Sequence, residues 1–139
     1  LYVSLHRNED AVKDLSRVIE LDPKARVALN NRALAYLGLG KGKEAIADLT
    51  RSIELDGKDA SAYATRGSAY ITIGDKEKAL DDLNKSIDMD PKLVVALVNR
   101  GVLLAAMGEK DKARADFNAV LAIDPGNASA KKQLADLGH

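Results

Sequence analysis

Charged side chains that could bind a ligand or perform acid–base chemistry recur at a fixed interval of 34 residues along this chain of 139 residues. The arginines of this pattern are Arg32, Arg66 and Arg100, and the aspartates are Asp14, Asp48, Asp82 and Asp116. A guanidinium group can hold a carboxylate with two parallel hydrogen bonds. We expect structural ion pairs across successive repeats, with Asp14 pairing to Arg32, Asp48 to Arg66, and Asp82 to Arg100. The alternative is that these arginines bind an acidic ligand.

Other residues that could support catalysis do not form a recognisable constellation. The two histidines, His6 and His139, stand near opposite ends of the chain, and neither has triad partners by spacing. The neighbouring carboxylates of Asp81 and Asp82 would point about 100° apart around a helix. The glycine-rich stretch LGLGKGKEA at 37–45 lacks the Gly-Lys-Ser/Thr ending of a phosphate-binding loop. We therefore expect no enzyme, with no catalytic residue, metal site or cofactor.

Composition narrows the range of partners. Lys and Arg number 21, Asp and Glu number 21, and the net charge is zero, which gives no electrostatic reason to expect nucleic acid or an anionic membrane. The sequence contains no cysteine, so disulfides and cysteine–zinc sites are excluded. Apolar runs stay far below the roughly 18 residues that a membrane span needs. The compartment stays open between cytoplasm and periplasm.

The elements that must position these residues repeat with the same period. Small residues recur at Ala11, Ala45, Ala79 and Ala113 and at Gly40, Gly74 and Gly108, and Asp-Pro or Asp-Gly pairs begin at residues 22, 56, 90 and 124. Apolar residues between them return at three- and four-residue spacing, which is typical of amphipathic helices. Glycine and proline are expected to end these helices. The predicted helices are 9–21, 25–38, 42–55, 59–72, 76–89, 93–106, 110–123 and 127–137.

This combination resembles the tetratricopeptide repeat family. The resemblance rests on the period, on the small residues Ala33, Gly67 and Gly101, on the column Tyr36, Tyr70 and Leu104, and on the Asp-Pro ends. It implies an all-α, right-handed superhelical solenoid of antiparallel helix pairs. We expect a single domain over 1–139. Its parts are the second half of a truncated repeat at 1–25, full repeats at 26–59, 60–93 and 94–127, and a capping helix at 128–139. One departure is Gly57, where the family usually has proline.

The family geometry also implies a peptide-binding groove lined by the first helix of each pair. The expected groove residues are Val27, Asn30, Asn31, Leu34, Ser61, Thr65, Ser68, Val95, Val98, Asn99 and Val102, with Ala64 beside them. All are neutral, so the cationic clamp with which one branch of the family grips an acidic carboxylate is not expected. Asn31, Thr65 and Asn99 resemble a ladder of side chains that hydrogen-bonds a peptide backbone, although exposed Asn can also be a merely tolerated polar residue.

The expected function is therefore a protein–protein interaction scaffold that binds a peptide or partner segment through neutral polar and apolar contacts. The alternatives are a homotypic assembly module, or the scaffold part of a longer enzyme or regulator. Self-association through 1–23 is suggested because Val12, Leu15 and Ile19 would lack their own partner helix. At the other end, Lys131 replaces the apolar residue of earlier repeats, which suits the polar outer face of a cap.

Overall fold

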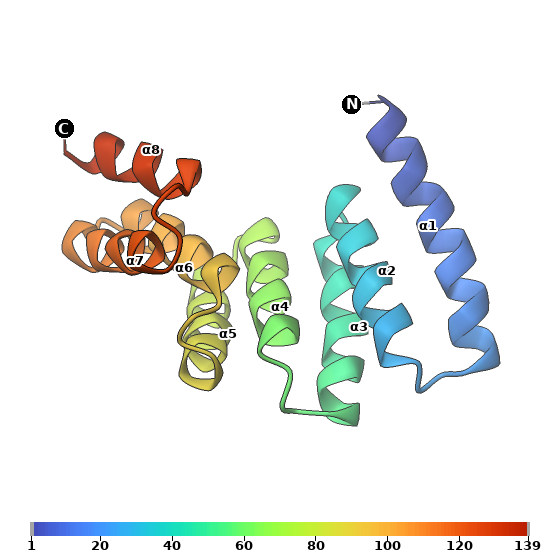
Figure 1. Cartoon of the computed structure of the whole chain (residues 1–139). Helices are drawn as coiled ribbons and strands as arrows, with labels where there is room; N and C mark the ends of the chain where they lie inside the picture. Colours follow the sequence, from blue (N-terminus) through green and yellow to red (C-terminus); the bar gives the residue numbers. More distant parts are fainter. Residues whose placement is uncertain (1, 139) are drawn as a thin grey trace.

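A computed structural model describes residues 2–138, with side chains from residue 6 onward, and this part of the chain is entirely helical. Figure 1 shows the helices following one another in a curved array. The eight helices are α1 (Tyr2–Leu21), α2 (Arg26–Gly38), α3 (Gly42–Leu55), α4 (Ala60–Thr72), α5 (Lys76–Met89), α6 (Val94–Ala106), α7 (Lys110–Ile123) and α8 (Ala128–Leu137). No described helix combines the length and the apolar character that crossing a bilayer requires.

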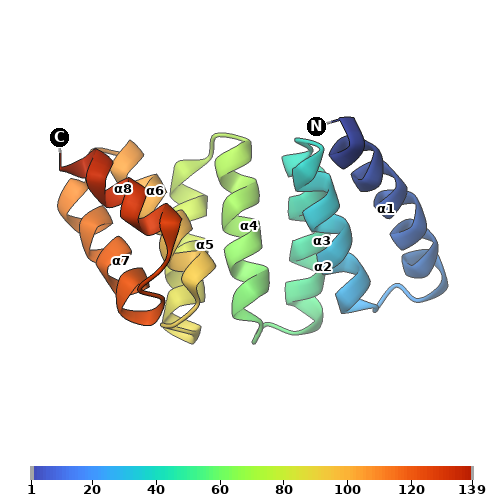
Figure 2. The same cartoon turned by 45° about the horizontal axis from the view of Figure 1, so that its top comes forward.

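The helices form two layers, and only in one of them do the helices contact one another. Each helix packs on the next one in the chain as an antiparallel neighbour, and α2, α4, α6 and α8 also contact one another in series (Figure 2). Within residues 2–138, the helices α1, α3, α5 and α7 make no such contacts among themselves. A layer whose members touch is shorter than a layer whose members are splayed apart. The array therefore curves with α2, α4 and α6 on its inner, concave side.

Glycine in the left-handed conformation ends three of the inner helices. Gly40, Gly74 and Gly108 have φ of 73°, 84° and 84°, which a residue with a Cβ adopts only at a cost. The chain can then reverse and start the next helix within a few residues. At the next start, the Asp75 carboxylate accepts a hydrogen bond from the Lys78 amide and caps α5. Because every element of the described residues is a helix, the predicted all-α fold is confirmed.

A second kind of turn leads from each outer helix to the next inner one. The Oδ1 atoms of Asp22, Asp56 and Asp90 accept hydrogen bonds from the amides two residues later, at 3.1, 3.0 and 3.1 Å. The turn at Gly57 has the same hydrogen bond as the turns at Pro23 and Pro91, whereas at Pro125 the Asn127 side chain donates to the Asp124 carboxylate instead. The aspartate side chain, rather than the proline ring, is therefore the shared feature that shapes this turn.

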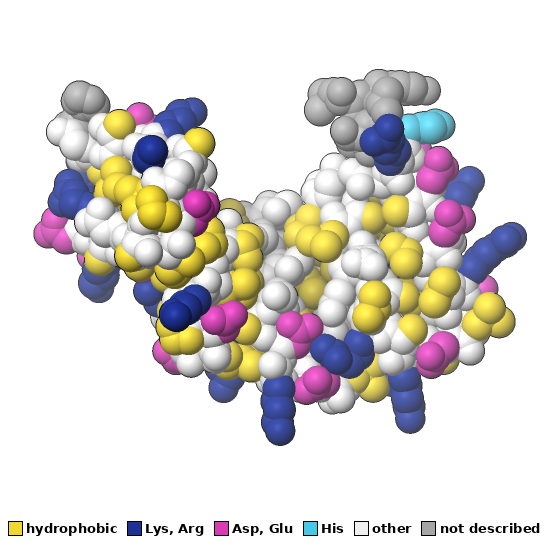
Figure 3. All heavy atoms as spheres, viewed as in Figure 1, with side chains coloured by type: hydrophobic (Ala, Val, Ile, Leu, Met, Phe, Trp, Pro, Cys, Tyr) yellow, Lys and Arg dark blue, Asp and Glu magenta, His cyan; other side chains and the backbone are white. Residues whose placement is uncertain are grey.

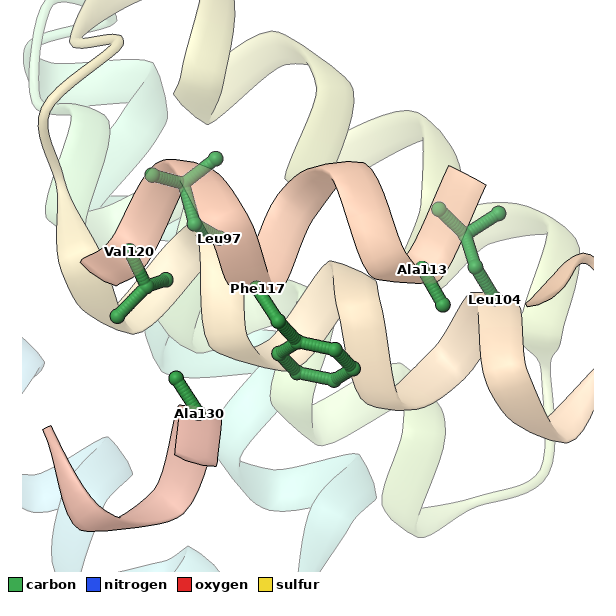
Figure 4. Close-up of a cluster of buried hydrophobic side chains, with 6 residues drawn as sticks. All are labelled: Leu97, Leu104, Ala113, Phe117, Val120 and Ala130. Carbon is green, nitrogen blue, oxygen red and sulfur yellow. The ribbon is translucent and has the colours of Figure 1, made fainter. Parts of the chain in front are cut away.

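The core is built from small residues on inner helices that face large residues on outer helices. A Cβ added to Gly67 would lie 2.9 Å from the Leu83 side chain, and one added to Gly101 would lie 2.7 Å from the Phe117 ring. These glycines let the paired helices approach closely. The last cluster has six buried side chains from α6, α7 and α8, with the Phe117 ring among the other five: Leu97, Leu104, Ala113, Phe117, Val120 and Ala130 (Figure 4).

The first helix differs from the prediction. The sequence places its start near residue 9, whereas α1 begins at Tyr2 and runs without a break. His6 has no glycine beside it to end a helix, so the backbone stays helical there, and its side chain is exposed. The other seven helices start and end within one residue of the predicted bounds. His139 lies outside the described residues.

Candidate binding groove

Each of the three periodic arginines is held by an aspartate of the helix that follows it. Arg32 donates from Nε and Nη2 to both carboxylate oxygens of Asp48, at 2.8 and 2.6 Å. The same bidentate geometry joins Arg66 to Asp82 at 2.7 and 2.8 Å, and Arg100 to Asp116 at 2.9 and 2.7 Å. The aspartates are buried, with 5%, 6% and 4% of their surface exposed. These are partly desolvated, well-aligned pairs rather than loose surface contacts.

The predicted pairing of these residues is wrong by one repeat. We expected Asp14, Asp48 and Asp82 to pair with arginines of the next inner helix, but Asp48 and Asp82 pair with Arg32 and Arg66 before them. The physical reason is that the inner helix lies closest to its own outer helix, where the small residue follows the arginine. The remaining guanidinium nitrogen, Nη1, donates backward to the preceding outer helix, at Ser16, Thr50 and Asn84.

These contacts keep the arginines charged and occupied. The hydrogen bonds to Asp48 raise the pKa of Arg32 above its ordinary value, and this effect outweighs the opposing effect of burial. Asp82 and Asp116 raise the pKa of Arg66 and Arg100 in the same way. A pKa raised by folding stabilises the fold below the unfolded-state value, and that stability is lost only as pH rises through the raised value. The pairs therefore persist at every physiological pH.

Tyrosine rings contact two of the three periodic arginines. The guanidinium carbon of Arg66 lies 5.6 Å from the Tyr63 ring centre and 6.0 Å from that of Tyr70, and Arg32 lies 5.7 Å from Tyr36. Cation–π contacts of this kind hold the guanidinium plane in place. With its hydrogen-bond donors directed at neighbouring helices, the arginine column links consecutive helices and has little capacity left for an acidic ligand.

The predicted groove contains two exposed apolar pairs. Val27 and Leu34 of α2 are 74% and 54% exposed, and Val95 and Val102 of α6 are 51% and 41% exposed. Members of each pair are seven residues apart, so they share one helical face. Between them, α4 carries Ser61 and Ser68 in the equivalent positions. The surface is hollowed between the α8 end and the α1 end of the molecule (Figure 3).

The predicted asparagine ladder is only partly open. Asn31 is exposed, and among the described residues its side chain makes no hydrogen bond. Asn99 is half-buried and donates through Nδ2 to the Ser68 hydroxyl at 2.8 Å, which ties α6 to α4. Thr65 donates its hydroxyl to the Ser61 carbonyl of its own helix at 2.9 Å. A peptide would meet a free amide at Asn31 and would have to share or displace a bond at Asn99.

Two predicted groove residues belong instead to the packing between helices. Asn30 is half-buried and donates to Asp59, the N-cap residue of α4, at 3.4 Å, while its own Oδ1 atom is buried without a partner. Val98 packs partly against the Phe117 cluster, and Ala64 in the same column is 1% exposed. This column faces the neighbouring inner helix because the inner helices touch one another. Its residues are therefore poor probes of binding.

Three exposed apolar side chains at the ends of inner helices were not singled out from the sequence. Ile71, Ile73 and Met107 are 38%, 41% and 42% exposed, and they lie at the carboxyl ends of α4 and α6. Ile73 and Met107 directly precede the periodic glycines Gly74 and Gly108, a position that suits core packing as well as exposure.

A cleft of about 320 Å³ lies among α5, α6 and α7, away from the predicted groove residues. Its lining includes Leu80, Asn84, Arg100, Leu104, Lys112 and Asp116. Arg100 is already bound to both Asp116 and Asn84 there, so these three polar side chains satisfy one another. Lys112 at the same cleft lies 3.9 Å from Glu109, outside the lining. Among the described residues no cluster of His, Cys, Asp or Glu could hold a metal ion.

Comparison with known proteins assigns the architecture to a class. Three tetratricopeptide repeat family models match residues 1–60, 60–93 and 94–127. The chain therefore belongs to the tetratricopeptide repeat family, as its sequence predicts. No curated protein sequence matches it significantly.

Solved structures of the family superpose closely. The chain is similar to MamA, with a TM-score of 0.83 and 28% identity over 94% of this chain and 76% of that one. It is also similar to the second repeat domain of human RPAP3, solved with the HSP70 peptide SGPTIEEVD (TM-score 0.75, 31% identity, 81% and 94% covered). The first repeat domain of Spaghetti (RPAP3), bound to the HSP90 peptide SRMEEVD, is similar as well. Its TM-score is 0.78 and its identity 25%, over 81% of this chain and 92% of that one.

Proposed function

We propose that the concave face of α2, α4 and α6 binds a segment of a partner protein through apolar side chains and backbone hydrogen bonds. The observation that carries this proposal is the pair of exposed apolar patches, Val27 with Leu34 and Val95 with Val102, on the inner layer. Exposed apolar side chains gathered on a concave surface are typical of an interaction site. Structural relatives solved with bound peptides support a binding role in general.

The distance between the two patches sets the length of the expected ligand. They are separated by α4, and interaxial distances of about 8–10 Å for each step put them roughly 16–20 Å apart. An extended peptide rises about 3.3 Å per residue, so it needs about five or six residues to reach from one patch to the other. The expected ligand has an apolar side chain at each end of such a span. Ser61, Asn31 and Asn99 would face its backbone between them.

The experiment compares glutamine substitutions in the groove with a glutamine substitution on an outer helix. Peptides selected from a random library on the wild-type protein are titrated against Val95→Gln/Val102→Gln and against Ile123→Gln. Val102 and Ile123 are 41% and 40% exposed, but Ile123 ends the outer helix α7. Glutamine removes the apolar contact, keeps the groove neutral and suits a helix.

We expect the groove variant to bind the selected peptides at least about tenfold more weakly, which corresponds to roughly 1.4 kcal/mol. The Ile123→Gln variant should bind them as the wild type does. Circular dichroism should show both variants folded. Unchanged affinity in the groove variant, or a loss confined to Ile123→Gln, would refute the groove as the binding site.

A further inference from the structure

The cleft among α5, α6 and α7 has a counterpart one repeat earlier. Five of its lining residues stand 34 positions after the residues that line a second cleft, of about 280 Å³. We call them the third-repeat and second-repeat clefts, because their arginines belong to the repeats at 94–127 and 60–93. The equivalent pairs are Arg100 and Arg66, Leu104 and Tyr70, Lys112 and Lys78, Ala115 and Asp81, and Asp116 and Asp82. The two sites can therefore be compared residue by residue.

The first difference is an aromatic ring. In the second-repeat cleft the centre of the Tyr70 ring lies 6.0 Å from the guanidinium carbon of Arg66 and 5.7 Å from the ammonium nitrogen of Lys78. Both distances are within the range of cation–π contacts. In the third-repeat cleft Leu104 replaces this tyrosine, and the cleft is larger, at about 320 Å³ against about 280 Å³. Two cations that flank a ring in one repeat therefore border open space in the next.

The second difference is the charge of the lining. The second-repeat cleft has two cations and two carboxylates, whereas the third-repeat cleft has two cations and one carboxylate, because Ala115 replaces Asp81. That one carboxylate is already bound by the arginine through two hydrogen bonds. Lys112 contacts Glu109 at 3.9 Å, with 69% and 51% of the two side chains exposed, and so loose a surface pair adds little. The excess positive charge of the lining therefore resides on Lys112.

We propose that the third-repeat cleft binds a small aromatic carboxylate. Its ring takes the place that the Tyr70 ring has in the second-repeat cleft, and its carboxylate pairs with Lys112. Leu80, Leu104 and Ala115 give the ring an apolar lining. A volume of about 320 Å³ is at the lower end of small-molecule sites, roughly 300–1,000 Å³, so a single ring suits it. The site lies away from the groove residues and does not depend on the groove binding a ligand.

The probe is phenylacetate, because it combines one ring with one carboxylate. Benzyl alcohol keeps the ring without the charge, and acetate keeps the charge without the ring. Each compound is titrated into the full chain while backbone amide signals are recorded by NMR. We expect phenylacetate to bind with a dissociation constant of about 1 mM or below, a reasonable affinity for about ten non-hydrogen atoms. Both analogues should bind at least about tenfold more weakly, because each lacks one of the two contacts.

Two substitutions give the third-repeat cleft the features of the second-repeat cleft. Leu104→Tyr supplies the ring, and Ala115→Asp supplies the carboxylate. Ala115 is exposed, so its substitution leaves the core intact and tests the site even where Leu104→Tyr disturbs the packing. A third variant, Lys112→Gln, removes the cation directly. Lys110→Gln is its matched control, because both lysines are exposed in the first turn of α7 and each substitution removes one positive charge.

We expect Leu104→Tyr to abolish binding of phenylacetate, and Ala115→Asp and Lys112→Gln to weaken it by about fivefold or more. Lys110→Gln should bind it as the wild type does. In the wild type the shifts should gather on α6 and α7 around Leu104, Lys112 and Ala115. Equal affinity in all variants, equal affinity for benzyl alcohol, or shifts centred on the groove would overturn the proposal. The absence of shifts at concentrations about tenfold above the expected dissociation constant would overturn it as well.

Discussion

At the scale of single residues, the periodic arginines hold the helices in register. Each one reaches forward to a buried aspartate and backward to a polar side chain of the preceding outer helix, as Arg66 does to Asp82 and Thr50. A buried ion pair adds little net stability compared with apolar packing, but breaking it leaves an uncompensated charge. The arginine column therefore fixes which helix surfaces meet.

The aspartates provide a direct test of this pairing. Asp82→Ala should destabilise the fold by about 2–4 kcal/mol, because it strands the half-buried Arg66 charge. Asp14→Ala should change stability by less than about 0.5 kcal/mol, because Asp14 is exposed and pairs with no arginine. Urea denaturation followed by circular dichroism measures both. A large loss for Asp14→Ala would instead support a pair between Asp14 and Arg32.

The period revealed this column, but it could not choose the partner. Arg32 is 18 residues after Asp14 and 16 residues before Asp48, and a turn lies midway in both cases, at Pro23 or Gly40. Two antiparallel neighbours are therefore equally compatible with the spacing. The choice depends on side-chain direction and on how closely Ala33 lets the helices approach, and both are set by packing.

At the scale of helices and turns, most boundaries could be predicted because glycine and aspartate mark them chemically. Gly40, Gly74 and Gly108 adopt positive φ, and Asp22, Asp56 and Asp90 accept a hydrogen bond in the following turn. Comparison with the repeats places a turn near His6, where the other repeats have glycine. No residue there ends a helix, so α1 begins earlier, at Tyr2. The groove residues were predicted from their equivalent positions in each repeat. Asn30 and Val98 are not on the open surface, because they take part in the packing between helices.

The turn at Gly57 can be stabilised. Asp56 has φ −155° and ψ 106°, the extended conformation that a residue before proline prefers. A Cβ added to Gly57 would make only ordinary van der Waals contact, 3.7 Å from the Ile53 carbonyl oxygen. Gly57→Pro should raise the free energy of unfolding by about 0.4–1 kcal/mol by restricting the unfolded chain. Chemical denaturation measures the change. Gly74→Pro is the control: with φ at 84° it should destabilise the protein. Loss of stability in Gly57→Pro would contradict this view of the turn.

At the scale of the whole molecule, stacking of repeated helix pairs produces a curved array with a neutral concave face. The residues predicted to line it include no charged side chain, and the arginines nearby are engaged by buried aspartates. The relatives solved with SRMEEVD and SGPTIEEVD carry acidic peptides. This chain shares their fold, but its groove offers no free cation at the predicted positions to pair with a carboxylate.

Acidic tails should therefore bind poorly. A peptide ending in Glu-Glu-Val-Asp is expected to bind at least about a hundredfold more weakly than a neutral peptide selected on this protein, a difference of roughly 2.8 kcal/mol. Isothermal titration at low and moderate salt measures both. Because acidic recognition rests on charge, tight binding of the acidic peptide that weakens with salt would contradict a neutral groove.

The claim that the concave face binds partner segments is tested most directly by mapping a bound peptide residue by residue. Backbone amide signals are recorded by NMR while a library-selected peptide is added. The account predicts shifts that gather on α2, α4 and α6, with the largest around Val95, Val102 and Asn31, and few on α3, α5 and α7. Shifts confined to the outer layer, with the inner helices unperturbed, would contradict it.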